Sequence, residues 1–122
     1  MATYATALLN GFLDFFDDQV NAGTGTAGFF KLEDASADSI CSFDFASPSA
    51  FAAGAGQSMT ANAIAAGTCA SAGTIGRATV YDTDSTELVV LTTGTSSAEC
   101  VLTSLTPSSG ASISISCFVV TI

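Results

Sequence analysis

The hydrophobic residues of this chain repeat with two different periods, and the change from one period to the other constrains the fold most. Over residues 3–22 the apolar side chains recur at intervals of three and four, as in an amphipathic helix. From residue 28 onward they alternate with polar residues in short runs, as in strands. A Gly-Thr-Gly-Thr stretch at 23–26 separates the two parts and suits a helix end. The sequence therefore predicts a mainly β fold with one N-terminal amphipathic helix.

The predicted helix has an apolar side that is a candidate docking face. Thr3 is in position to cap the start of the helix. The acidic residues Asp14, Asp17 and Asp18 are expected to form a solvated face near its other end. The same apolar side would also serve to cover a sheet, as in an ordinary α+β fold, and both interpretations stay open. The candidate docking residues are Leu8, Leu9, Phe12, Leu13, Phe15 and Phe16.

The β part divides into about seven runs separated by Gly, Ser, Asp and Pro. The expected strands span residues 28–33, 40–45, 59–65, 74–81, 87–93, 100–105 and 112–122. The run at 87–93 is apolar enough to be more buried, and 112–122 is expected in the middle of a sheet. Residues 52–57 and 66–73, rich in alanine and glycine, are expected loops. This pattern predicts an antiparallel β-sandwich or small barrel in one domain, with residues 1–22 as helix and 28–122 as sandwich.

Charge excludes several classes of function. The chain has 11 acidic residues and a formal net charge of −9, with Lys31 and Arg77 as its two cations. Neutralising phosphates requires Lys and Arg, so we expect no nucleic-acid partner and no docking on an anionic membrane surface. No stretch approaches the roughly 18–20 apolar residues of a membrane span, and the first charged residues are acidic, unlike a signal peptide.

The four cysteines are expected to remain thiols in a reducing cytoplasm. Cys41, Cys69, Cys100 and Cys117 form no CxxC pair, and the chain has no histidine to complete a zinc site. Buried small-hydrophobe roles are expected for them, with a disulfide formed after release from the cell as the alternative.

No pattern of catalytic residues is present in the sequence. Histidine, the commonest general base, is absent, and only Lys31 and Arg77 could activate a serine or cysteine. Residues 82–87 begin like a calcium loop, but the required glycine and the twelfth-position glutamate are missing, so a polar turn is favoured. We therefore expect no enzyme, no cofactor and no metal.

The order of the sequence features resembles one known family. After the helix come the stretch FDFASPSAF at 43–51, Ala- and Gly-rich spacers, ANAI at 61–64, GTIGRATVYD at 73–82 and a closing Ser/Ile/Val strand. Together these resemble the small structural virion proteins, of decoration or cement type, encoded among the head and tail genes of tailed bacteriophages and prophages. The resemblance implies a structural protein without catalytic residues.

Within a phage particle, the acidic charge favours a place on the outer capsid surface, away from packaged DNA. We expect a capsid decoration protein that is assembled in the host cytoplasm, binds the major capsid protein and stabilises the head. Shell geometry favours a homo-oligomer, with a trimer as first choice. Two other functions stay open: a tail or fibre component that binds a host surface, and a small-ligand carrier built on a β-barrel.

Overall fold

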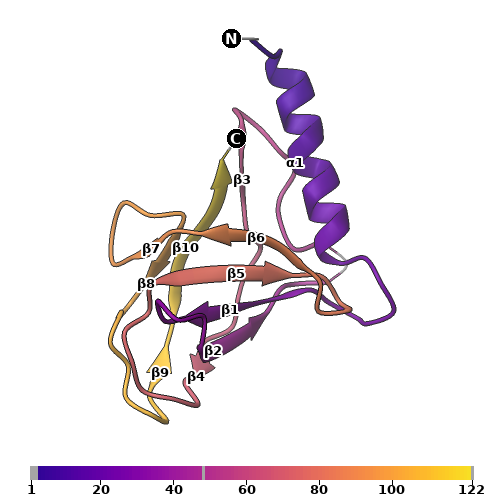
Figure 1. Ribbon diagram of the computed structural model, residues 1–122. Helices are drawn as coiled ribbons and strands as arrows, with labels where there is room; N and C mark the ends of the chain where they lie inside the picture. The colour runs from indigo at the N-terminus through magenta and orange to yellow at the C-terminus, as the bar shows by residue number, and fades with distance from the viewer. Residues whose placement is uncertain (1–2, 48, 122) are drawn as a thin grey trace.

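The computed structural model describes residues 3–47 and 49–121. Met1, Ala2 and Ile122, which the predicted helix and last strand include, lie outside these ranges. Within the described residues, one helix precedes ten strands (Figure 1). Their bounds are α1 (Thr6–Val20), β1 (Phe29–Glu33), β2 (Ser39–Asp44), β3 (Ser58–Thr60), β4 (Gly67–Thr68), β5 (Arg77–Tyr81), β6 (Glu87–Leu91), β7 (Thr93–Gly94), β8 (Cys100–Leu102), β9 (Ser112–Ile113) and β10 (Ile115–Thr121).

The strands form two four-stranded sheets and a small two-stranded one. The strand orders are β2-β1-β5-β6, β3-β10-β8-β7 and β4-β9. Neighbouring strands pair antiparallel except β7 and β8, which run parallel. The arrangement is sandwich-like and no closed barrel forms within the described residues, so the predicted mainly β fold with one N-terminal helix is confirmed.

Several predicted strands are shorter or divided. The run at 59–65 reduces to β3, because the chain leaves β10 after Ala61, whose N–H donates to the Phe118 carbonyl at 2.8 Å. The run at 112–122 divides into β9 and β10 at Ser114, whose backbone exchanges hydrogen bonds with Thr103. The expected loop at 66–73 contains β4, which pairs with β9.

The first sheet places β6 at its edge, so the prediction of a more buried strand at 87–93 is wrong. β6 pairs only with β5 in this sheet, and Val90 lies opposite Thr79 on the outer face, where it is 43% exposed. Leu91 lies on the inner face and is buried. The apolar run therefore serves one buried face and one exposed face.

The second sheet has β10 between β3 and β8, which confirms the predicted central position of the last strand. Phe118 and Val120 point into the core from β10. A register irregularity between Ile115 and Cys117 divides the pairing of β10 with β8. The other side of the strand stays partly in solvent, with Cys117 exposed and Val119 half-buried.

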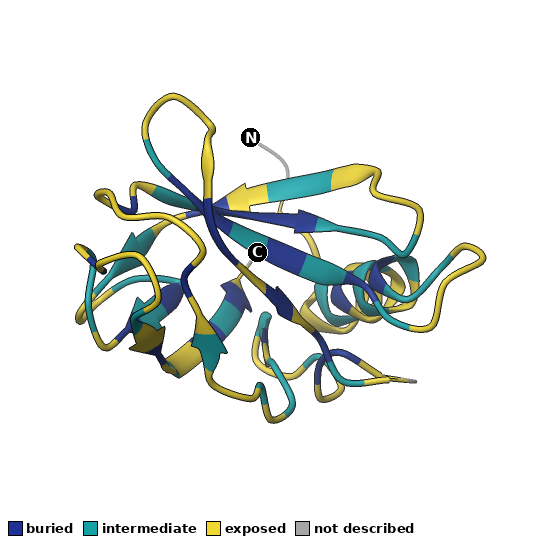
Figure 2. Cartoon of the chain, turned by 90° about the horizontal axis from the view of Figure 1, so that it is seen from below, coloured by how far each residue is buried: buried dark blue, intermediate teal, exposed yellow. Residues whose placement is uncertain are grey.

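Phenylalanine rings fill the space between the two large sheets. The Phe30 ring of β1 and the Phe118 ring of β10 have centroids 4.8 Å apart, so they join the sheets directly. Figure 2 shows buried segments on the facing strands, with exposed loops around them. The rings that pack against one another are Phe30, Phe43, Phe45, Phe51 and Phe118. Buried aromatic pairs of this kind contribute about 0.5–1.5 kcal/mol each beyond area burial.

The helix begins later than predicted. Its N-cap is Ala5, with no side-chain cap among the described residues, so the prediction that Thr3 caps the helix is wrong because Thr3 lies before the cap position. At the other end, Asn21 accepts a hydrogen bond from the Gly28 N–H and donates one to the Ala46 carbonyl. These bonds tie the end of α1 to the start of the first sheet. No helix in the described part of the chain has the length and apolarity that crossing a membrane requires.

Candidate interaction surface

One face of α1 packs on the sandwich. Leu13 and Val20 are buried, and Phe16 is half-buried with its ring centroid 5.9 Å from that of Phe51. Leu9 is half-buried. The spacing of four, three and four residues from position 9 to position 20 keeps these side chains on one side of the helix. This face covers the core, as an ordinary α+β arrangement requires.

A ladder of polar side chains holds the helix against the segment at 51–57. Asn10, Asp14 and Asp17 lie on successive turns of α1, and each accepts a hydrogen bond from a backbone N–H. The donors are Gln57 at 3.0 Å, Gly54 at 2.7 Å and Phe51 at 2.9 Å, respectively. The prediction that the acidic residues form a solvated face is therefore wrong for Asp17, which is half-buried, whereas Asp14 is exposed and also accepts a hydrogen bond.

Two details show how closely this segment approaches the helix. A Cβ atom at Gly54 would lie 2.9 Å from the Asn10 carbonyl oxygen, so the contact requires glycine. Burial raises the pKa of Asp17 above its ordinary value of 3.8, while the amides of Phe51 and Ala50 act in the opposite direction. The Asp17 carboxylate is thus held by backbone N–H groups but loses part of its contact with water.

A second apolar stripe runs along another side of the helix and faces solvent. Leu8, Phe12 and Phe15 form it at steps of four and three residues along α1, and Tyr4 adds to it just before the helix begins. Their exposed fractions are 56% for Tyr4, 48% for Leu8, 48% for Phe12 and 63% for Phe15. We call these four residues the exposed stripe. Figure 1 shows α1 beside the sheets, with its amino-terminal turns projecting away from them.

The predicted docking face therefore divides into two parts. Leu8, Phe12 and Phe15 belong to the exposed stripe, whereas Leu13 is buried in the core and cannot dock on a partner. Leu9 and Phe16 lie between these extremes. The signal that separates the two sets was present in the sequence, because positions 9, 13, 16 and 20 and positions 4, 8, 12 and 15 lie on different sides of a helix.

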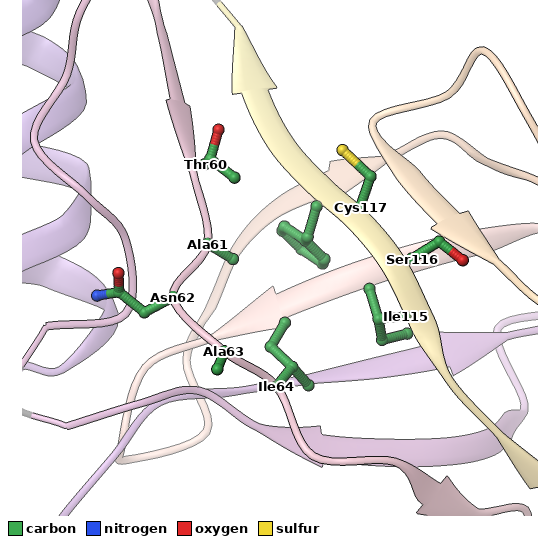
Figure 3. Close-up of a pocket in the computed structure, with 9 residues that line it drawn as sticks. Thr60, Ala61, Asn62, Ala63, Ile64, Ile115, Ser116 and Cys117 are labelled. Atoms are coloured by element: carbon green, nitrogen blue, oxygen red, sulfur yellow. The ribbon is translucent and has the colours of Figure 1, made fainter.

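A groove of about 200 Å³ opens where β10 and the segment after β3 separate (Figure 3). It is lined by Thr60, Ala61, Asn62, Ala63, Ile64, Ile115, Ser116, Cys117 and Phe118. These lining residues are small, apolar or neutral, so the groove offers no set of convergent ionisable groups for catalysis. Cys117 is exposed at its edge, so the expectation that all four cysteines are buried is wrong for this one. Cys117 faces outward because its neighbour Phe118 takes the core side of the strand.

The other cysteines behave as buried hydrophobes. All four are free thiols, and Cys41, Cys69 and Cys100 are buried, which confirms the prediction for these three. Burial raises the pKa of the Cys41 thiol to about 12, with a further contribution from the neighbouring Cys69. Burial also raises the pKa of Cys100 to about 12. Thiols with such a pKa are poor nucleophiles at neutral pH.

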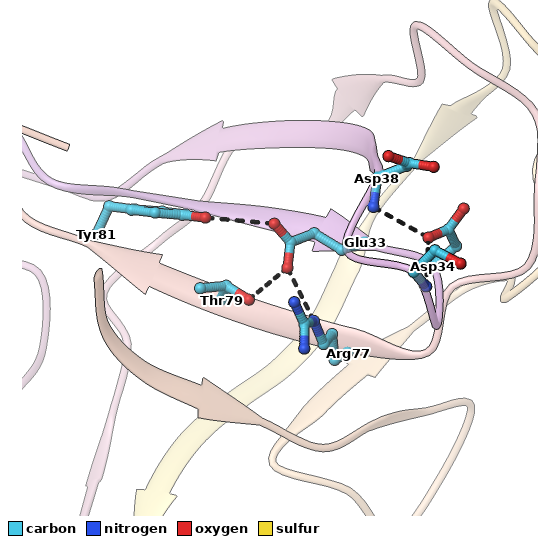
Figure 4. A network of polar contacts seen from close by, with 7 residues as sticks. Glu33, Asp34, Asp38, Arg77, Thr79 and Tyr81 are labelled. Atoms are coloured by element: carbon cyan, nitrogen blue, oxygen red, sulfur yellow. Dashed lines mark hydrogen bonds and ion pairs between the residues drawn. The ribbon is translucent and has the colours of Figure 1, made fainter. Parts of the chain in front are cut away.

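Both cations of the chain lie on the outer face of the first sheet. Arg77 Nε lies 3.0 Å from Glu33 Oε1, and the buried Thr79 hydroxyl donates to the same oxygen at 2.6 Å (Figure 4). The Tyr81 hydroxyl donates to the other oxygen at 3.3 Å. Burial, and then the nearby Glu33 carboxylate, raise the pKa of Tyr81. Lys31 Nζ lies 5.3 Å from the centre of the Tyr81 ring. The Glu33 carboxylate is satisfied within the fold, so this network is structural.

The calcium-like stretch forms a polar turn between β5 and β6, as predicted. Asp82 Oδ1 accepts hydrogen bonds from the N–H groups of Asp84 and Thr86. Asp84 Oδ1 accepts from the hydroxyl and the N–H of Thr24, which joins the turn to the linker after the helix. These carboxylates are thus used in local structure. The described residues contain no group of three or more potential metal ligands.

Comparisons with models of protein families, with curated proteins and with solved structures found no match. The resemblance to phage virion proteins stays a prediction from the sequence.

Proposed function

We propose that this chain is a non-enzymatic structural protein of a virus particle, a decoration or cement protein on the outer surface of a tailed-phage head. The exposed stripe carries the proposal. Three large apolar side chains aligned on one exposed face of α1, with the exposed Tyr4 just before the helix, are typical of a surface that becomes covered in an assembly. The resemblance of the sequence to phage virion proteins gives that assembly its identity.

The charge of the chain supports an outer position. A protein with a net charge of −9 is repelled by packaged DNA and carries only two cations to oppose that repulsion. The polar groups of the described chain support a structural role, since Glu33, Asp17 and Asp82 all bind within the fold. The proposed partner is the major capsid protein. A ligand that binds only the assembled shell stabilises that shell by mass action.

A tail or fibre component that binds a host surface is the alternative. Aromatic side chains exposed on loops would favour it, because such side chains bind sugars and proteins through their ring faces. The large exposed aromatic residues of the described chain, Tyr4, Phe12 and Phe15, lie instead on or just before α1. This placement favours assembly over recognition by loops.

The test is binding to phage shells purified without this protein. Shells are sedimented with increasing amounts of the chain, and unassembled capsid subunits serve as the control. We expect saturable binding at a fixed ratio to the capsid subunit, together with a higher melting temperature of the shell. Absence of binding, or equal binding to unassembled subunits, would contradict the proposal.

A further inference from the structure

The exposed stripe lies on a helix whose charges are unevenly distributed. All three carboxylates of α1, Asp14, Asp17 and Asp18, occur in its second half, and the helix has no basic residue. Carboxylates near the carboxyl end of a helix oppose its dipole, and those of Asp14 and Asp18 are exposed. The first turn has no acidic residue, and no described side chain caps it. Each end of α1 therefore lacks the charge that its dipole favours.

An antiparallel neighbour of the same kind supplies that charge at both ends. In such a pair, the acidic half of each helix lies beside the amino-terminal turns of the other, where backbone N–H groups carry partial positive charge. The two acidic halves then lie at opposite ends of the pair. A parallel pair or trimer would instead gather every copy of Asp14 and Asp18 at one end, where like charges repel.

The centre of the exposed stripe allows two helices to approach closely. Gly11 lies between Leu8 and Phe12, and no described atom lies within 4 Å of a Cβ atom placed there. This glycine costs the helix about 0.5–1 kcal/mol relative to alanine, and no contact with another described residue requires it. Ala7, one turn earlier, is also small and exposed. A second helix would fill this space.

We propose that the exposed stripe binds the same stripe of a second copy, forming an antiparallel two-fold dimer through α1. The stripe is nearly symmetric about residues 9 and 10, so Leu8 of each copy lies near Phe12 of the other. A two-fold contact of identical surfaces is the commonest form of homo-oligomer. The inference depends on α1 alone, and it assigns to a second copy of this chain the stripe that the proposed capsid function leaves to a neighbouring molecule of the assembly.

Sedimentation velocity and light scattering over 1–100 µM protein test the dimer. We expect wild type at twice the chain mass of 12.1 kDa. The double substitution Phe12→Ser/Phe15→Ser should weaken self-association by at least about 100-fold, because central aromatic residues dominate small interfaces. Val90→Ser is the matched control, since Val90 is an exposed apolar residue on β6, outside the helix, and this variant should remain dimeric. Circular dichroism checks that the helix persists in each variant.

Spin labels at position 18 test the orientation. Asp18→Cys is made in a Cys117→Ser background, because the other three cysteines are buried. At about 1.5 Å rise per residue, two labels in an antiparallel pair lie roughly 25 Å or more apart, and in a parallel assembly about 10–15 Å.

Three results would overturn the inference. One is a wild-type chain that stays monomeric at 100 µM. Binding of that monomer to neutral phosphatidylcholine vesicles or to phage shells through Phe12 and Phe15 would then identify a different partner for the stripe. Another is a double variant that associates as strongly as wild type. The third is a short distance between the labels, which would show a parallel assembly, including the trimer that shell geometry suggests.

Discussion

Removal of the Glu33 carboxylate should destabilise the sandwich measurably, because a buried hydroxyl depends on it. Thr79 is fully buried, and its hydroxyl donates to Glu33 Oε1 at 2.6 Å. In Glu33→Ala this donor loses its acceptor, which costs about 1–3 kcal/mol. Arg77 is 35% exposed on its side chain, so water replaces its partner at a cost of about 0–1 kcal/mol.

The net loss is smaller than the sum of these costs, since the variant no longer buries a carboxylate. We expect Glu33→Ala to lower the free energy of unfolding by about 2 kcal/mol. The control is Asp44→Ala, which removes an exposed carboxylate from the same sheet face and should change stability by less than about 0.5 kcal/mol.

Urea unfolding followed by circular dichroism measures both variants, with equal slopes required before their midpoints are compared. If Glu33→Ala and Asp44→Ala lie within about 0.5 kcal/mol of each other, the network does not hold the two strands as described.

Three further predictions concern the thiols, the helix ladder and two glycines. In native protein at pH 8, iodoacetamide should alkylate one thiol, that of Cys117, whereas in urea it should alkylate all four. Intact mass spectrometry counts the adducts, and two or more adducts on the native protein would contradict the burial of the other three cysteines. Because the folded-state pKa of Asp17 is raised, this residue favours folding less as the pH rises from about 3.8 through the folded pKa. Asp17→Asn, which keeps an acceptor for the Phe51 N–H, should therefore gain stability relative to wild type across that window, and a difference independent of pH in urea titrations would refute this. Gly28→Ala should lower the melting temperature strongly, because its Cβ would meet the backbone oxygen of Val20. Gly11→Ala, compared at a protein concentration where the chain is monomeric, should instead stabilise it by about 0.5–1 kcal/mol. Similar calorimetric shifts for both variants would show that the close approach at Gly28 is not real.

The sequence predicted the elements whose pattern is local. The alternation around Phe118 predicted β10, and its apolar second half predicted a central position, which the pairing of β10 with β3 and β8 confirms although one side of the strand is exposed at Cys117. The period of three and four residues predicted α1. The same kind of reasoning failed for β6, since a run of four apolar residues does not distinguish a central strand from an edge strand with Val90 in solvent.

Long-range contacts could not be predicted. The carboxylate of Asp14 accepts from Gly54, 40 residues away, and Asp17 accepts from Phe51, 34 residues away. Nothing near either carboxylate in the sequence indicates these donors, so the residues resembled an ordinary solvated face. Strands of two residues, such as β4 and β7, are defined by their partners and have no period of their own.

The exposed stripe was partly predictable. The sequence identifies the apolar residues of α1 as candidates for docking, but its period of three and four residues predicts a single apolar side. Placing Leu8 and Leu13 on separate sides requires the helix geometry to be followed residue by residue. Which side faces the core then depends on the segment at 51–57, which only the tertiary structure brings to the helix.

A cryo-EM map of the phage particle that carries this protein, at a resolution that shows side chains, tests the central proposal most directly. We predict density for the chain on the outside of the head, at symmetry or local-symmetry axes, with the stripe of Leu8, Phe12 and Phe15 covered by a neighbouring molecule. Density only in the tail, absence of the chain from the particle, or a stripe that remains in solvent would contradict it.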